Sequence, residues 1–240
     1  MTITPHQTLA SLVTGHHEVV PILEKYHLDF CCKGKRTLKE ACDESELSLE
    51  KVIQEMEVLT SPEEKINLPF GEMSAEQLIG HILTRHHFYV KQTMPTISGH
   101  LKKVVSKHGE RHPEMVNVLA LFTAVTEEMT LHMQKEEMIL FPRILETEKL
   151  FNVGGRPCQP PMYINGPVRM MEMEHEQAGA QLQEIRQLTN DYIPPADSCT
   201  TYKVSLAELK EFEKDLHQHV HLENYLLFPL AEKMAGSFLV

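Results

Sequence analysis

Apolar side chains recur along four long stretches of this chain at alternating steps of three and four residues. That spacing places them on one face of an α-helix, whereas a half-buried strand would alternate at every second residue. No strand-like run rises above this background. The sequence therefore predicts an all-α protein, most of which is an up-down four-helix bundle.

The core-facing stripe of each predicted helix can be read directly from this spacing. The four stripes are Leu83, His87, Val90, Met94, Ile97 and Leu101; Val118, Phe122, Val125, Met129, His132, Glu136 and Ile139; Val168, Met171, His175, Ala178, Leu182 and Ile185; and Leu209, Phe212, Leu216, His219, Glu223, Leu226 and Leu230. Each apolar stripe is interrupted near its middle by a histidine, or by a histidine and a glutamate. The interruptions fall at about one level of the bundle.

Local signals indicate where some of these helices begin. Ser74 and Gln77 form a capping box at the start of the first helix. Pro167 stands where a first-turn proline is tolerated, at the start of the third. Residues 148–166, which precede it, are rich in Gly and Pro and predict a loop.

The first 60 or so residues carry shorter helical patterns, including the predicted helices Thr37–Cys42 and Ser48–Leu59. A polar segment with Pro and Gly follows them. We expect a small helical domain over residues 1–62, a linker over 63–72 and the bundle over 73–240.

Charge and composition narrow the classes of partner. Of 240 residues, 34 are acidic and 23 basic, which gives a formal net charge of −11 and argues against a nucleic-acid groove. No apolar run approaches the roughly 18 residues of a membrane helix, and the first residues lack the blocks of a signal peptide. Five cysteines are a sparse, odd count for a disulfide framework. We expect a cytoplasmic protein without nucleic-acid or membrane partners.

A repeated motif marks the level at which the stripes are interrupted. His132 and Glu136 begin the pattern H-x3-E-x4-F-P, and His219 and Glu223 begin it again with identical spacing. A His and a Glu four residues apart project from one face of a helix, and imidazole with carboxylate suits iron, among other first-row metals. We interpret the two copies as halves of one dinuclear metal site.

The burial of carboxylates in these stripes identifies the candidate ligands. An unpaired carboxylate in an apolar core costs at least several kcal/mol, and the stripes contain no Lys or Arg to compensate it. A metal pair is therefore the natural partner. The predicted ligands are His87, His132, Glu136, His175, His219 and Glu223. They are enough to hold two irons with bridging carboxylates and an oxo or hydroxo group.

The remaining histidines are predicted to lie outside the site. His86 falls on a polar face, and His217 and His221 point away from the ligand between them. Four others are expected at the surface or in loops: His81, His100, His108 and His112. Glu128, one turn before the second helix's ligand pair, either contacts a ligand or lines a channel if buried, or is an ordinary solvated residue.

Cys31 and Cys32 form a second candidate site. Adjacent cysteines do not easily close an unstrained disulfide with each other, so the pair suits thiol redox chemistry or binding of a soft metal. The basic residues Lys33, Lys35 and Arg36 would favour the thiolate form. The alternative is that both are small buried residues. The other cysteines are predicted to be structural: Cys42, Cys158 and Cys199.

These motifs resemble those of the repair-of-iron-centres family, the YtfE/ScdA/DnrN-like di-iron proteins. Residues 26–38, Tyr-His-Leu-Asp-Phe-Cys-Cys-Lys-Gly-Lys-Arg-Thr-Leu, look like the signature of that family's small amino-terminal domain. The two H-x3-E-x4-F-P copies and residues 173–179, Met-Glu-His-Glu-Gln-Ala-Gly, resemble its bundle. The resemblance covers nearly the whole chain.

The resemblance implies a hemerythrin-like up-down bundle preceded by a small helical ScdA-type domain. It also implies a di-iron centre held by the six residues above, with the two glutamates as bridging carboxylates. Glu128 and Glu174 match acidic residues near that site and its access route. Cys31 and Cys32 match the vicinal cysteines of the family's small domain and are the candidate catalytic residues.

The implied function is repair of iron–sulfur clusters damaged by nitric oxide or oxidative stress, with iron donated from the di-iron centre. Damaged iron–sulfur proteins are then the expected partners, and nitric oxide or oxygen the expected small ligands. The alternative is a hemerythrin-like protein that binds, senses or reduces such ligands, and the sequence leaves open whether the chain is an enzyme. A ferritin-type oxidase fits less well, because the bundle carries one E-x-x-H motif, Glu172 to His175.

Overall fold

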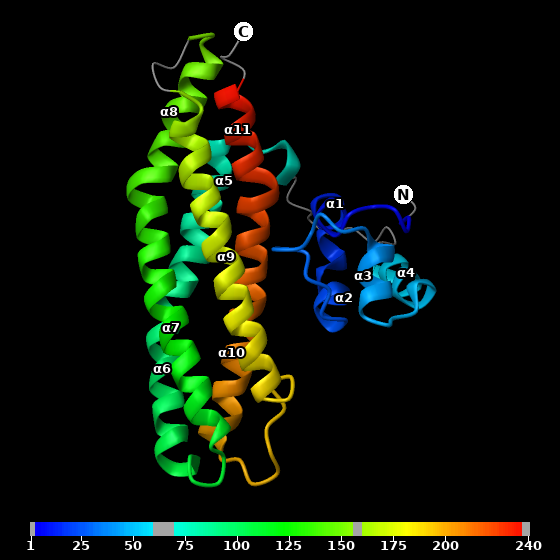
Figure 1. The fold of residues 1–240 in the computed structure, drawn as a ribbon, viewed down its shortest axis with the longest axis vertical. Coiled ribbons are helices and arrows are strands. Elements are labelled where there is room, and N and C mark those ends of the chain that lie inside the picture. Colours follow the sequence, from blue (N-terminus) through cyan, green and yellow to red (C-terminus); the bar gives the residue numbers. More distant parts are fainter. Residues whose placement is uncertain (1–2, 60–69, 156–159, 237–240) are drawn as a thin grey trace.

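The computed structural model describes residues 3–59, 70–155 and 160–236. In these ranges all regular structure is helical, and the one β contact is an isolated bridge between Thr8 and Thr37. Four long rods stand side by side, and a small group of helices lies against one flank (Figure 1). The predicted all-α class is confirmed. Within the described ranges, no helix combines the length with the apolar content needed to cross a bilayer.

The rods of the bundle are long helices, three of which contain a π-helical segment. The first rod comprises α5 (Ala75–His81), η3 (Ile82–His87) and α6 (Phe88–His108); the second, α7 (Glu114–Lys135), η4 (Glu136–Leu140) and α8 (Phe141–Asn152); the third, α9 (Met162–Leu188); and the fourth, α10 (Thr200–Leu222), η5 (Glu223–Leu227) and α11 (Phe228–Gly236). Helix α6 packs on α7 and α10, and α7 packs on α9.

The small amino-terminal unit consists of short helices. They are α1 (Leu9–Gly15), η1 (His17–Val19), α2 (Val20–Lys25), α3 (Leu38–Glu44) and α4 (Leu49–Leu59). A capping box of Thr37 and Glu40 starts α3, close to the predicted start. The short η2 (Phe70–Glu72) leads into the bundle. The predicted boundary at 62 and most of the predicted linker 63–72 fall in residues 60–69, outside the described residues, so this division stays a prediction.

The buried apolar side chains form two clusters along the bundle. One joins the small unit to one end of the rods and includes Phe30, Phe122 and Phe212. The other fills the opposite end and includes Phe141 and Phe228. Between them, each rod contributes buried histidine, or histidine and glutamate. The polar groups therefore form a layer that separates two apolar cores.

Most predicted stripe positions are buried, but the stripes of the second and fourth rods shift by one residue at the π segments η4 and η5. Ile139 is predicted in the core, yet its side chain is 45% exposed and Leu140 is buried instead. Likewise Leu227 is fully buried, where the stripe predicts Leu226. A π segment inserts one extra residue into the helix, so the face that meets the core advances by one position.

The third rod begins before Pro167, which the sequence places in a first helical turn. Helix α9 starts at Met162, so Pro167 lies inside it and cannot donate to the carbonyl of Tyr163. The guanidinium of Arg143, in α8, donates to that carbonyl at 3.1 Å instead. With this substitute donor the helix continues through the proline, and the connection between α8 and α9 is shorter than the predicted loop.

Buried Glu148 ties α8 to the start of the first rod. Its two carboxylate oxygens accept the backbone N–H groups of Ala75 and Glu76 at 2.6 and 3.0 Å. These N–H groups lie in the first turn of α5, where no carbonyl of the helix can reach them. The negative charge also complements the positive end of the helix dipole.

Replacing Glu148 with Ala should lower the free energy of unfolding by about 1–3 kcal/mol, because the buried N–H of Ala75 and the partly buried N–H of Glu76 lose a charged acceptor. Urea unfolding monitored by circular dichroism measures the change. Glu146→Ala, at an exposed position of the same helix, is the matched control. Equal stability of the two variants would contradict this role.

Candidate metal centre

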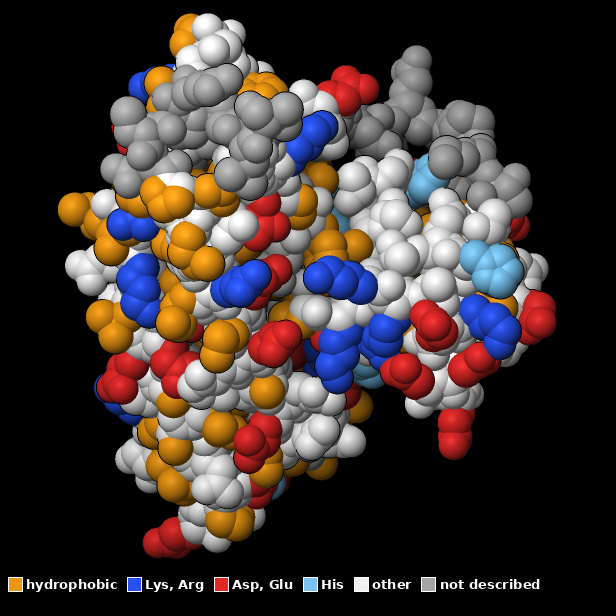
Figure 2. All heavy atoms as spheres, turned by 45° about the horizontal axis from the view of Figure 1, so that its top comes forward, with side chains coloured by type: hydrophobic (Ala, Val, Ile, Leu, Met, Phe, Trp, Pro, Cys, Tyr) orange, Lys and Arg blue, Asp and Glu red, His pale blue; other side chains and the backbone are white. Residues whose placement is uncertain are grey.

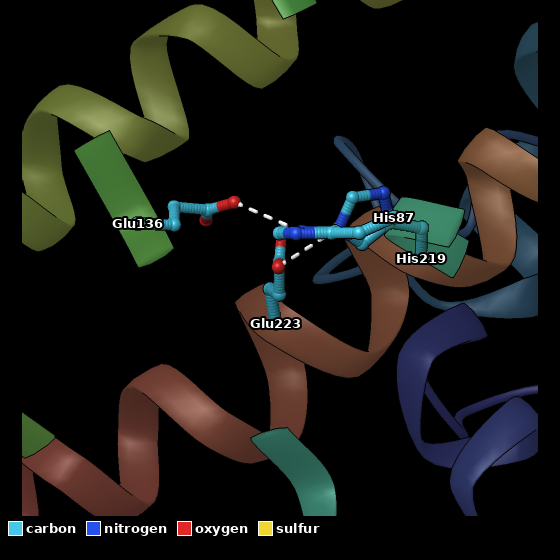
Figure 3. Close-up of side chains that lie close together, drawn as sticks. All are labelled: His87, Glu136, His219 and Glu223. Carbon is cyan, nitrogen blue, oxygen red and sulfur yellow. Dashed lines mark hydrogen bonds and ion pairs between the residues drawn. The ribbon is translucent and has the colours of Figure 1, made fainter. Parts of the chain in front are cut away.

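The four rods each bring one histidine to a single buried cluster, and the second and fourth rods each add a glutamate. These residues are His87, His132, Glu136, His175, His219 and Glu223. They are the six predicted ligands, and each side chain is 1% exposed or less. Figure 3 shows four of them with their polar ends turned toward one another.

Glu136 lies between two imidazoles from different rods. Its Oε2 is 3.3 Å from Nε2 of His87 and 3.4 Å from Nε2 of His132. Neither carboxylate oxygen of Glu136 has a hydrogen-bond partner in the described part of the chain. A charged group at zero exposure is thus left with unsatisfied lone pairs.

Glu223 has the same position relative to the other two imidazoles. Its oxygens are 3.1 Å from Nε2 of His175 and 2.9 Å from Nε2 of His219. The six side chains therefore form two groups that share both glutamates, and the ligand atoms of each group lie within 4.8 Å of one another. One group holds His87 and His219, and the other holds His132 and His175.

The donor atoms fit a pair of cations. Ligands bound to one ion at about 2.1 Å and at right angles lie about 3.0 Å apart, close to the 2.9–3.4 Å separations between imidazole and carboxylate. Nε2 of His132 and Nε2 of His175 also lie 3.0 Å apart. This separation also matches two imidazole nitrogens bound to one ion. Such cations would also satisfy the free oxygens of Glu136.

Hydrogen bonds on the outer side hold two of the rings in place. Nδ1 of His87 lies 2.7 Å from Glu137, and Nδ1 of His132 lies 2.9 Å from Glu174. A carboxylate at Nδ1 keeps the proton on that nitrogen and turns the Nε2 lone pair toward the centre. Sequence reasoning did not identify Glu137, because a glutamate directly after a ligand looks like part of a solvated face.

The other two rings have different surroundings. Nδ1 of His175 lies 2.9 Å from the amide oxygen of Asn224. Nδ1 of His219 has no hydrogen-bond partner within the described ranges, and its ring stacks at 5.6 Å on His86. His86 is buried against Asp215, at 3.1 Å, rather than lying on the predicted polar face. The π segment η3 causes this difference, because its wider turn brings both His86 and its neighbour inward.

The π segments coincide with the ligands. Segment η3 ends at His87, while η4 begins at Glu136 and η5 at Glu223. In η4 the N–H of Phe141 donates to the carbonyl of Glu136, five residues back. Pro142 follows and has no N–H with which to continue the α-helical pattern. The F-P end of each motif is therefore the signal in the sequence that could have predicted a π segment, which occurs often at functional sites.

Burial and the neighbouring charges together set the pKa values of the cluster residues. Burial lowers the pKa of His132, but the adjacent Glu136 carboxylate outweighs burial and raises that pKa to about 9. Burial raises the pKa of Glu223, but His219 and His175 hold it well below its usual range. The glutamates are therefore anionic, and the site has a strong preference for positive charge.

The structure also places Glu128 and His108, two residues for which the sequence analysis made predictions. Glu128 lies outside the cluster, since its Oε1 accepts from Gln177 at 2.8 Å and Gln181 at 3.2 Å across α7 and α9. His108, predicted at the surface or in a loop, is buried at the end of α6 because its ring packs edge-on against Tyr202.

Cys31 and Cys32 lie on the loop between α2 and α3, next to the metal-site level of the bundle. Sγ of Cys32 is 3.7 Å from the carbonyl oxygen of His175. The amide of Asn224 donates to the carbonyl of Cys31 at 3.2 Å, so one side chain contacts both the loop and the His175 ring. A hydrogen bond with Cys32, together with burial, raises the pKa of the Cys31 thiol well above its usual value.

Comparison with known proteins adds family information to this geometry. Residues 78–231 match the model of the hemerythrin HHE cation-binding domain. Residues 5–60 match ScdA_N, which is described as a domain of unknown function.

Curated relatives match nearly end to end. The chain is 34% identical over 224 residues to a probable iron–sulfur cluster repair protein of Haemophilus influenzae, covering 93% of this chain and 95% of the relative. It is 32% identical to the iron–sulfur cluster repair protein YtfE of Yersinia pseudotuberculosis, covering 94% and 96%. A protein of the same name from an Enterobacter species is also 32% identical, covering 96% and 98%.

Removal of the outer carboxylate of Glu174 should weaken metal binding. Glu174→Ala should lower metal affinity by about 10- to 100-fold, and Glu174→Gln by less, because Gln keeps an acceptor for the Nδ1 proton of His132. Equilibrium dialysis against a competing chelator measures the affinity. Glu127→Gln, at an exposed position of α7, should leave it unchanged; an equal loss in that control would show a general charge effect instead.

Metal binding should release protons. His132 has a pKa of about 9 in the protein alone and is protonated at pH 7, whereas an ion binds only neutral imidazole. Affinity should therefore rise with pH up to about 9 and then level off. Calorimetric titration at neutral pH in two buffers of different ionisation enthalpy counts the protons, and identical heats in both buffers would contradict the expectation.

Proposed function

This chain belongs to the hemerythrin HHE family, and from that premise we propose that it repairs iron–sulfur clusters damaged by nitric oxide or oxidative stress by donating iron from a non-haem di-iron centre. The observation that carries the proposal is the pair of glutamates at zero exposure, each facing two imidazoles. The choice of activity is supported by the relatives, which are named as iron–sulfur cluster repair proteins and align over more than nine-tenths of the chain.

The six cluster residues would hold the irons. His87 and His219 would bind one iron, and His132 and His175 the other, while Glu136 and Glu223 would bridge them. When bound, the pair supplies one-electron redox chemistry and coordination positions at which nitric oxide or oxygen can bind. Four neutral histidines and two glutamates provide two negative charges, so ferrous ions would be held without a fully compensating anionic shell.

The protein around the site controls exposure and orientation. Rings of Phe141 and Phe228 stack on His87 and His175, at centroid distances of 5.7 and 6.1 Å, and exclude water from the apolar end of the bundle. Lys91 donates to Glu137 at 2.6 Å and holds that carboxylate against the His87 ring. These groups fix the ligands before iron arrives, which lowers the cost of ordering them on binding.

The small unit would connect the centre to the client protein. Residues 1–62 would form the domain that carries Cys31 and Cys32, residues 63–72 the linker, and residues 73–240 the bundle. Cys32 lies against the backbone of a proposed ligand, which supports a role for the cysteines in passing on iron or electrons. The four cysteines in the described ranges are free thiols, in keeping with work in the reducing cytoplasm on damaged iron–sulfur proteins.

Repair can be tested with the full-length, iron-loaded protein and an iron–sulfur enzyme inactivated by nitric oxide. We expect two irons per chain and recovery of the client's activity, even when a ferrous chelator traps free iron. The variant Cys31→Ser/Cys32→Ser should keep both irons and lose repair, whereas Cys199→Ser, distant from the loop, should keep both properties.

Other outcomes would exclude parts of the proposal. Full repair by the double variant would remove the role of the cysteines. Reversible binding or turnover of nitric oxide without recovery of the client would favour the sensing or nitric-oxide-reducing alternative. One metal per chain would contradict the dinuclear centre.

A further inference from the structure

The loop with the adjacent cysteines opens on a cleft between the small unit and the third and fourth rods. The cleft has a volume of about 440 Å³ and is lined by Asp29, Cys31 and Cys32 on one side and by Gly179 of α9 on the other. Lys and Arg side chains gather along this junction (Figure 2). Both cysteines line the cleft, with Cys32 partly exposed and Cys31 buried, so a ligand that enters the cleft reaches the pair at Cys32.

The sulfur atoms are separated by a distance that suits a metal ion and excludes a disulfide. Sγ of Cys31 lies 3.7 Å from Sγ of Cys32, whereas a disulfide bond is about 2.05 Å long. Two thiolates bound to one tetrahedral ion at about 2.3 Å lie about 3.8 Å apart. The observed separation therefore equals the edge of a tetrahedral thiolate site within about 0.1 Å.

Asp29 supplies a candidate third ligand for the same tetrahedral site. Its Oδ1 is 3.3 Å from Sγ of Cys31, while a thiolate and a carboxylate oxygen on one tetrahedral ion lie about 3.5 Å apart. One ligand atom from each of Asp29, Cys31 and Cys32 lies within 4.8 Å of the others. Three ligands with a fourth position left for solvent or substrate are typical of an exchangeable site rather than a permanent structural one.

We propose that Asp29, Cys31 and Cys32 form a separate mononuclear site for a thiophilic divalent cation, with its fourth coordination position open to the cleft. Binding releases the thiol protons to solvent and exchanges no electrons, so the ion enters and leaves by ligand exchange alone. The site is distinct from the buried histidine–glutamate cluster, because it shares no residue with it.

Asp29 also stabilises the fold of the loop, and a test of metal binding has to distinguish this structural role from ligation. Its Oδ1 accepts the backbone N–H groups of Cys31 at 3.1 Å, Cys32 at 2.8 Å and Lys33 at 3.3 Å. These hydrogen bonds hold the turn in which both sulfurs face the same side. An asparagine at position 29 would keep an acceptor oxygen for the turn and lose the ligand charge.

The position of this site suits an intermediate binding site for iron that moves from the di-iron centre to a client protein. This role rests on the proposed function. Sγ of Cys32 touches the carbonyl of His175 at 3.7 Å, and Asn224 joins the His175 ring to the backbone of Cys31. An ion at the cysteines would therefore lie beside the backbone of one residue of the buried cluster. The positive charges of Lys33 and Arg36 at the cleft would attract the anionic thiolates of a client that lacks iron.

Titration of the iron-loaded, full-length protein with Co²⁺ under anaerobic conditions tests the site. We expect one additional equivalent of Co²⁺ with thiolate-to-metal charge-transfer absorption. That absorption should disappear in Cys31→Ser and in Cys32→Ser and persist in Cys199→Ser. Asp29→Asn should weaken Co²⁺ binding by at least about tenfold, while its circular dichroism and unfolding midpoint stay close to those of the parent protein.

The outcomes separate this proposal from the function proposed above. Absence of the charge-transfer band, or its persistence in both cysteine variants, overturns the site, and unchanged Co²⁺ affinity in Asp29→Asn overturns the third ligand. Iron content and the iron spectrum of the same samples report on the buried cluster independently. A Co²⁺ site beside a chain without two irons would support the cysteine site and contradict the di-iron function.

Discussion

The structure depends on the burial of two carboxylates at the boundary between two apolar cores. Glu136 and Glu223 lie at zero exposure, and among the described residues their ion-pair partners are histidines rather than Lys or Arg. Removing such charges from water costs more than hydrogen bonds to neutral imidazoles return. The bundle can thus keep this polar layer only with positive charge inside it. The rods, the π segments and the outer carboxylates all serve to place six donor atoms around that charge.

The fold and the six candidate ligands could be predicted because they depend on periodicity and burial, which are local properties of the sequence. A histidine or glutamate in an apolar stripe stands out when its neighbours three and four residues away are Leu, Val or Phe. The π segments could not be read in this way, because the stripe assumes a uniform helical period, and one extra residue moves Leu140 and Leu227 to the positions predicted for Ile139 and Leu226.

Contacts between rods were the other part that the sequence did not reveal. Glu137 and Asn224 resemble solvated neighbours of a ligand, and only the packing of another helix shows that they touch His87 and His175. The guanidinium of Arg143 compensates for Pro167 from a different rod, so no local rule predicts that α9 continues through it. Such pairs are distant in sequence and carry no periodic signal.

The small unit meets the bundle through a close backbone contact at which a side chain larger than that of glycine would clash. The N–H of Gly34 donates to the hydroxyl of Tyr225 at 2.8 Å, two residues beyond Glu223. A Cβ atom at Gly34 would lie 2.2 Å from the carbonyl oxygen of Phe30 and 3.0 Å from the Tyr225 ring, so only glycine permits this approach. The loop with the thiols is thereby fixed to the same turn that carries a proposed bridging ligand.

The bond from Asn224 to His175 also makes the two halves of the centre unequal. Asn224 joins the half that contains His132 and His175 to the cysteine loop, whereas the ring of His219 in the other half stacks on His86. Of two ions bound in the centre, the one held by His132 and His175 would lie on the side joined to the cysteine loop, and the other would not. Departure toward the loop would then be sequential, and a chain that had given up one ion would still retain a mononuclear remainder.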